Sequence, residues 1–237
     1  MARGLLLVAH GSRDPRAAAV ALGVAAAVGR AAGVVAGAAF LELAEPSPRQ
    51  ALDLLAEQGV DAVSVQPFLL SHAYHSKIDL PGVVALVEAR GWTARLGEVL
   101  GPDDLLIDAL ERRVGAAVEA LYPPREYDGL VLAAAGSSDP EANRAVQGAA
   151  ESLGERLGRP SVPGFASAAR PSTAEAVARL QGTGVRRIVV ATYLLAPGYF
   201  ADRVRTEATD AGAVAVAAPL GSAPEIVDLV LRRANLP

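Results

Sequence analysis

The chain has 237 residues, of which 51% are hydrophobic and 4% aromatic, and its formal net charge is -4. It contains no cysteine, which excludes disulfides, thiolate nucleophiles and thiolate metal sites and fits a cytoplasmic location. Basic runs with interleaved aromatics are missing, so we expect no nucleic-acid partner. The longest apolar run, 17–29, falls short of the roughly 20 residues that span a bilayer, so we expect no membrane segment.

The first half alternates short apolar runs with longer amphipathic ones. In chain order, we expect a strand over 4–9, a helix over 15–32, a strand over 35–41, a helix over 47–58, a strand over 61–68, a helix over 81–90, a strand over 93–98 and a helix over 102–120. The uninterrupted apolar run 4–9 is typical of a parallel strand buried on both faces. Asp14-Pro15 and Ser47-Pro48 predict helix starts, because each pairs an N-cap residue with a proline at the first helical position.

The second half of the chain repeats the first. An offset of 125 aligns 4–79 with 129–204 without a gap, and about 25 of these 76 positions are identical. Toward the end the offset becomes 120, which pairs Leu100-Gly101 with Leu220-Gly221. The chain is therefore a tandem duplication.

The polar, Pro-rich stretch 121–129 marks the junction of the two copies. We therefore expect an α/β protein with two similar domains, 1–121 and 122–237. Each would be a four-stranded parallel sheet flanked by helices, with an active-site cleft between the two domains.

Polar side chains follow the first three predicted strands. His10 comes after the first strand, Glu42 after the second, and the loop 71–75, with His72 and His75, after the third. Ligands of open parallel sheets bind beyond the carboxyl ends of the strands, so these groups should meet at one edge. Imidazoles and a carboxylate suit a divalent transition-metal ion.

The repeat provides an internal control for this site. At the offset of 125, the counterparts of His10, Glu42, His72 and His75 are Ala135, Ser167, Pro197 and Phe200. Every candidate ligand is replaced, whereas glycines, prolines and Tyr74 with its copy Tyr199 are kept. We therefore expect one active centre, in the first domain, and a degenerate site in the second.

Simpler roles stay open for these residues. A histidine at a strand end can satisfy backbone groups, and Glu42 can be a solvated carboxylate or pair with Arg49. Glu45 is the competing carboxylate. Ser12 and Asp14 suit a turn and a helix cap.

Three ordered motifs resemble the sirohydrochlorin chelatases, which are type II chelatases. The segments are Val8-Ala-His-Gly-Ser-Arg-Asp-Pro15, Phe40-Leu-Glu-Leu-Ala-Glu-Pro46, and Pro67-Phe-Leu-Leu followed by His75-Ser-Lys-Ile-Asp79-Leu-Pro81. The resemblance covers the whole chain, because longer members of that family are also fused tandem repeats. It implies a chelatase that inserts Fe²⁺ or Co²⁺ into sirohydrochlorin, on the way to sirohaem or cobalamin.

The resemblance also implies residue roles. The metal-binding histidines fall on His10 and His75, with Glu42 as their acidic partner, and these three are the expected catalytic residues. His72 departs from the usual loop. The expected substrate-binding residues are Arg13, Ser12, Tyr74 and Lys77.

The expected partner is the tetrapyrrole, with the metal ion as a substrate and no permanently bound cofactor. A monomer suffices if both halves of the cleft belong to one chain. Two other functions share part of this pattern. A histidine phosphatase needs an arginine before the first histidine, and position 9 is alanine. A metal or tetrapyrrole binding protein without catalysis would keep the same ligands, and is the alternative.

Overall fold

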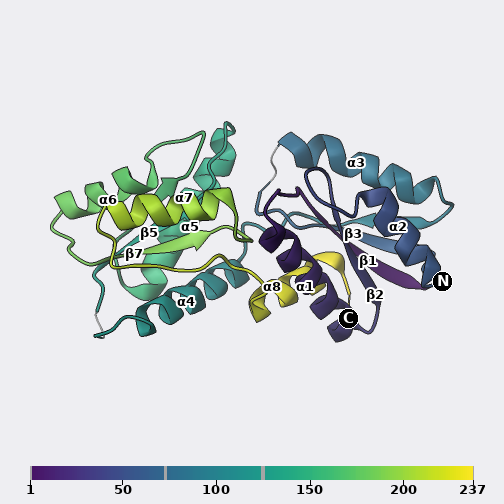
Figure 1. Ribbon diagram of the computed structural model, residues 1–237, viewed down its shortest axis with the longest axis horizontal. Helices are drawn as coiled ribbons and strands as arrows, with labels where there is room; N and C mark the ends of the chain where they lie inside the picture. The colour runs from purple at the N-terminus through teal and green to yellow at the C-terminus, as the bar shows by residue number, and fades with distance from the viewer. Residues whose placement is uncertain (1, 72–73, 124–125, 237) are drawn as a thin grey trace. The chain divides into compact units, whose positions relative to one another are not determined.

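The chain is described by a computed structural model that covers residues 2–71, 74–123 and 126–236, with the backbone alone for 74–78. It divides into two compact units, Met1–Gly101 with Ser222–Pro237 and Pro102–Gly221. Each unit contains one parallel sheet with helices on both faces (Figure 1).

The first unit is built on a sheet of strand order β2-β1-β3-β4. Its elements are β1 (Arg3–Ala9), α1 (Pro15–Ala32), β2 (Val35–Phe40), α2 (Pro48–Glu57), β3 (Ala62–Pro67), α3 (Tyr74–Glu88), β4 (Thr93–Leu96) and α8 (Pro224–Ala234). All three strand pairs are parallel, in the register that sets Leu6 opposite Gly37 and Val65.

The second unit repeats this design with strand order β6-β5-β7-β8, again all parallel. Its elements are α4 (Asp104–Glu119), β5 (Gly129–Ala134), α5 (Pro140–Leu157), β6 (Ser161–Phe165), α6 (Thr173–Gly182), β7 (Ile188–Tyr193), α7 (Tyr199–Asp210) and β8 (Ala215–Val216). The predicted pair of four-stranded parallel sheets is confirmed.

The predicted helix starts are confirmed at their caps. The Asp14 side chain accepts a hydrogen bond from the backbone N–H of Arg16, and Pro15 opens α1. Ser47 and Gln50 form a capping box at the start of α2, with Pro48 in its first turn. These local signals place the loops that precede both helices, and those loops carry the candidate site.

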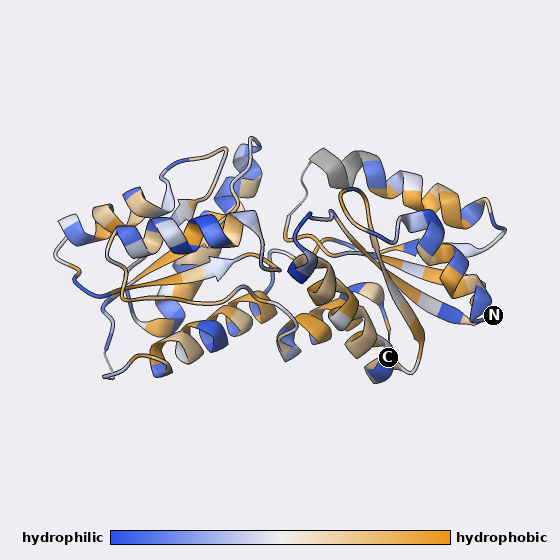
Figure 2. Cartoon of the chain, viewed as in Figure 1, coloured by the Kyte–Doolittle hydropathy of each residue, from blue (hydrophilic) through white to orange (hydrophobic). Residues whose placement is uncertain are grey.

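Continuous apolar strands form the centre of each unit. Leu5, Leu6 and Leu7 of β1 are fully buried, as are Leu130, Val131 and Leu132 of β5. Figure 2 shows mainly hydrophobic strands, whereas the helices alternate hydrophobic and hydrophilic stretches. This burial on both faces fixes the sheet and leaves its carboxyl edge to the loops.

The third helix differs from the prediction. Pro81 was expected to open a helix over 81–90, but α3 begins at Tyr74 and contains Pro81 in its interior. An interior proline removes one backbone hydrogen bond and disfavours the turn before it, yet α3 is helical on both sides of Pro81. Position 75 therefore lies in the first turn of a helix and not in a loop.

The two compact units differ from the domains expected at 1–121 and 122–237. The chain leaves the first unit after Gly101 and returns to it after Gly221, which are equivalent positions of the repeat. Helix α4 therefore packs on β7 and α5, and α8 packs on α1 and β3. Each copy of the repeat gives its last helix to the other copy.

Equivalent arginines tie these helices to their units. Arg233 of α8 donates to Glu98 at 2.7 Å, just after β4. Arg113, its counterpart on α4, donates to the carbonyl of Leu220 at 2.7 Å, after β8.

Among the helices of the described ranges, none combines the length and the apolar character that a membrane span requires.

Candidate metal and active site

The loops after β1 and β2 are joined by backbone hydrogen bonds. The N–H of Leu41 donates to the carbonyl of Ala9 at 3.0 Å, and the N–H of Glu42 donates to that of His10 at 2.9 Å. The parallel ladder therefore continues one step beyond the strands. It sets His10 and Glu42 side by side at the carboxyl edge of the sheet, as predicted.

The two side chains meet at this edge. His10 Nδ1 lies 3.2 Å from Glu42 Oε1, with 42% of the histidine and 50% of the glutamate side chain exposed. Nδ1 itself is buried, so the exposed surface of the ring belongs to its other atoms. When one nitrogen of an imidazole binds a metal ion, a carboxylate that contacts the other nitrogen fixes the orientation and tautomer of the ring.

Gly11 makes this arrangement possible. Its φ is +104°, and a β-carbon at this position would lie 1.6 Å from the carbonyl oxygen of Glu42. A residue with a side chain would collide with the backbone that positions the glutamate. The glycine between His10 and Ser12 therefore has a steric function.

A pocket of about 570 Å³ opens beside the pair. Glu42 and His10 line it from the strand edge, and Asp79, Val83 and Leu86 line it from α3. Asp79 belongs to the third motif but is not among the residues that the sequence predicts for the site. The spacing of a helix could have indicated Asp79, because it follows position 75 by one turn of α3 and so shares its face.

The remaining candidates fall into two groups. The Ser12 hydroxyl accepts from the backbone N–H of Asp14 at 3.1 Å, which is a hydrogen bond typical of a turn. Arg13 is exposed and does not line this pocket. The second group has no described side chain: Tyr74, His75 and Lys77 lie in the first turn of α3, and His72 falls outside the described residues.

Glu42 and Glu45, the two carboxylates considered for the site, have different neighbours. Its ion-pair partner among the described residues is His10 and not Arg49. Glu45, the competing carboxylate, accepts from the backbone N–H of Ser47 at 3.2 Å and lines a separate pocket with Leu54. In the described part of the chain, no three side chains of the metal-ligating types cluster.

The sequence and the fold were compared with known proteins. The CbiX family model matches residues 4–117 and, a second time, 129–235. The chain belongs to the CbiX family. The double match coincides with the two copies of the internal repeat.

The curated relatives of this CbiX chain are chelatases. It is 29% identical over 214 residues to the sirohydrochlorin ferrochelatase of Bacillus subtilis, covering 87% of this chain and 79% of the relative. It is 28% identical over 207 residues to the sirohydrochlorin cobaltochelatase of Priestia megaterium, covering 85% and 67%. The structure of SirB from Bacillus subtilis with Fe³⁺ superposes with a TM-score of 0.82 at 27% identity, covering 99% of this chain and 95% of that one.

The second CbiX repeat keeps the frame of the site without its chemistry. Ala166 and Ser167 donate to the carbonyls of Ala134 and Ala135, both at 2.8 Å, as Leu41 and Glu42 do in the first unit. Gly136 has φ +85°, and its β-carbon would lie 2.0 Å from the Ser167 carbonyl oxygen. The backbone is thus duplicated, whereas the imidazole and the carboxylate occur only in the first unit.

Proposed function

We propose that this protein is a sirohydrochlorin chelatase, which inserts Fe²⁺ or Co²⁺ into sirohydrochlorin for sirohaem or cobalamin synthesis. The His10–Glu42 pair beside its pocket carries the proposal, because an identical backbone frame in the second unit holds Ala135 and Ser167 instead. Membership of the CbiX family and the chelatase names of both curated relatives support the same reaction.

The reaction needs a metal ion that loses water and an acceptor for two pyrrole protons. For each M²⁺ that enters the ring, two N–H protons leave, so the metallated ring keeps the charge of the free macrocycle and the two protons carry away the charge of the ion. Imidazole binds borderline divalent ions and also accepts protons near neutral pH. We assign metal binding to His10 and His75, and to Glu42 either metal binding or removal of a pyrrole proton.

Two features of the described residues support these roles. The contact between Glu42 and His10 Nδ1 turns one nitrogen of the ring toward the carboxylate. Position 75 is one helical turn before Asp79, which lines the same pocket. Asp79 adds a second carboxylate at the pocket, a further candidate to receive a proton.

Contacts to the tetrapyrrole carboxylates are assigned to cationic and polar groups near the site. Arg13, Ser12, Tyr74 and Lys77 are the candidates, since arginine and lysine bind carboxylates through charge-assisted hydrogen bonds. A cleft between the two halves, which would orient the ring, stays a prediction. We further propose that the metal is a substrate and not a resident cofactor, and that the chain acts as a cytoplasmic monomer.

The test is an anaerobic spectrophotometric assay with sirohydrochlorin and Fe²⁺ or Co²⁺. It compares the parent with a His10→Ala, His75→Ala double variant. Multiple turnovers by the parent alone support the chelatase and its one-sided site. Equal, uncatalysed rates for both proteins contradict the proposal and favour metal or tetrapyrrole binding without insertion.

A further inference from the structure

The second unit carries a pocket of its own. Its volume is about 670 Å³, and it lies between the loop after β5, the start of α5, β6 and the loop after β6. Val162, Pro163 and Phe165 give it an apolar wall. Three arginines line it from three separate elements: Arg144 on α5, Arg170 on the loop after β6 and Arg179 on α6.

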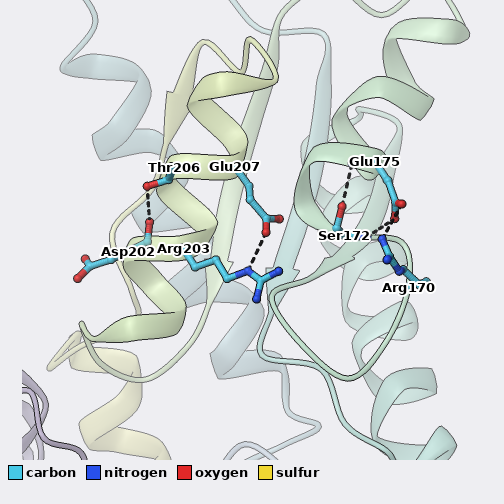
Figure 3. A network of polar contacts seen from close by, with 7 residues as sticks. All are labelled: Arg170, Ser172, Glu175, Asp202, Arg203, Thr206 and Glu207. Atoms are coloured by element: carbon cyan, nitrogen blue, oxygen red, sulfur yellow. Dashed lines mark hydrogen bonds and ion pairs between the residues drawn. The ribbon is translucent and has the colours of Figure 1, made fainter.

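The charge of this lining is entirely positive. Among the described residues that line the pocket there is no aspartate or glutamate. Two carboxylates outside the lining pair with two of the arginines. Glu175 accepts from Arg170 at 2.6 Å, and Glu141 is 3.7 Å from Arg144 (Figure 3 shows the first pair).

Glu175 orients Arg170, and both of its carboxylate oxygens already accept hydrogen bonds. Its second oxygen accepts from the backbone N–H of Ser172 at 2.7 Å, the capping-box bond of α6. This N–H and then Arg170 hold the pKa of Glu175 below its usual value. Arg179 has no ion-pair partner in the described part of the chain, so the pocket keeps an excess of positive charge.

The polar side of the pocket is fixed by an asparagine. The Asn143 side chain accepts from the N–H of Ser137 at 3.0 Å and donates to the carbonyl of Ser137 at 2.8 Å. This two-point contact holds the loop that presents Ser137 and Ser138 to the pocket. The Ser137 hydroxyl in turn accepts from the backbone N–H of Asp139 at 3.0 Å, so this side of the pocket is held by its own hydrogen bonds.

The first repeat shows that these residues are special to the second unit. Ser12, Pro15, Phe40 and Pro46 match Ser137, Pro140, Phe165 and Pro171, so the frame of the pocket is the same in both copies. In contrast, Ala18, Ala19, Glu45 and Leu54 stand where the second unit has Asn143, Arg144, Arg170 and Arg179. Three cations and an orienting amide therefore stand on this shared frame in one copy only.

We infer that this pocket binds an organic anion that carries several carboxylates on an apolar body. The arginines would form charge-assisted hydrogen bonds to the carboxylates, and Val162, Pro163 and Phe165 would contact the apolar part. The inference does not depend on metal insertion, because no residue of this pocket belongs to the pocket of His10.

The experiment is isothermal titration calorimetry at low ionic strength, without metal or tetrapyrrole. The probes are benzene-1,3,5-tricarboxylate and inorganic phosphate. The test variant combines Arg144→Ala, Arg170→Gln and Arg179→Leu, because the first repeat already holds alanine and leucine at two of these positions. The matched control is Arg205→Leu on α7, an exposed arginine outside the pocket.

The parent and Arg205→Leu should bind one tricarboxylate per chain, more tightly than phosphate, and added salt should weaken the binding. The triple variant should bind it about tenfold more weakly or worse, from the usual small contribution of each exposed ion pair. Equal binding by all three proteins would overturn the site, and equal affinity for phosphate would overturn the role of the apolar wall. Circular dichroism of the triple variant checks that it is folded.

Discussion

The backbone of Gly11 approaches Glu42 so closely that a β-carbon on the glycine would lie 1.6 Å from the glutamate carbonyl oxygen. Gly11→Ala should therefore displace the 41–43 loop and lower turnover. The positive φ of this position should add a strain of about 1–3 kcal/mol that destabilises the folded state. The stability loss is measured by urea unfolding and the turnover by the chelatase assay.

Two glycines serve as controls for this prediction. Gly136→Ala meets the equivalent Ser167 carbonyl in the second unit and should lower stability without removing metal binding at His10. Gly33→Ala has φ +64° with open space around it and should show the strain alone. If Gly11→Ala behaves like Gly33→Ala, the close approach has no functional consequence.

His10→Ala and Glu42→Ala should each lower turnover by roughly 10²-fold or more, the usual range for a positioned acid–base group. Because the two side chains are 3.2 Å apart, the double variant should lose less than the sum of the single losses in free energy. Turnover and Co²⁺ binding are both measured. Ser167→Ala, at the second-unit position of Glu42, is the control that should change neither.

Substitutions can distinguish the roles of His72 and His75. Position 75 lies in α3 one turn before Asp79, whereas His72 precedes the helix. His75→Ala should therefore abolish most Co²⁺ binding and turnover, and His72→Ala should retain both. The reverse result would move the second imidazole ligand to His72 and contradict the assignment of His75.

Asp128 connects the start of β5 with the segment before β7. Its carboxylate accepts from the backbone N–H of Arg187 at 2.6 Å and from that of Arg186 at 3.1 Å, which holds its pKa below the usual 3.8. A lowered pKa stabilises the folded state above pH 3.8, and this stabilisation is lost as the pH falls through the folded-state pKa.

Asp128→Asn should therefore be less stable than the parent at pH 7, and the difference should shrink as the pH falls below 3.8. The difference in the free energy of unfolding is measured by urea unfolding at roughly pH 7, 5 and 3.5. Asp210→Asn, at an exposed helix end, is the control. A difference that stays constant with pH would show that the charge of Asp128 is not responsible.

The exchange of terminal helices predicts where core mutations act. Ile226 on α8 and Leu106 on α4 are equivalent and fully buried, so truncation of either to alanine should cost about 2–5 kcal/mol. Ile226→Ala should deprotect amides of β1 and β3, and Leu106→Ala those of β5 and β7, in hydrogen exchange. Deprotection within the same copy of the repeat would contradict the exchange.

Much of this protein was determined by its sequence. Continuous apolar strands predicted parallel sheets, because strands covered on both faces need no polar alternation. The offset of 125 predicted two similar units and showed that His10 and Glu42 belong to one of them. Their meeting followed from a general rule, that the carboxyl ends of adjacent parallel strands share an edge.

The start of α3 does not follow from a local sequence signal. The helix predicted over 81–90 begins earlier in the structure, because α3 extends toward its N-terminus to Tyr74. The lining position of Asp79 depends on that extension. A local signal marks where a helix is able to begin, whereas packing on the sheet decides where it does begin.

The partner of each terminal helix was also beyond the sequence. Helices α4 and α8 are equivalent in the repeat. Their apolar patterns therefore do not reveal which of the two sheets each helix packs on. The arginine pocket is a similar case, because Arg144, Arg170 and Arg179 are separated along the chain and meet only through the fold. Sequence periodicity fixes which face of an element is buried, but the choice among equivalent partners belongs to the chain as a whole.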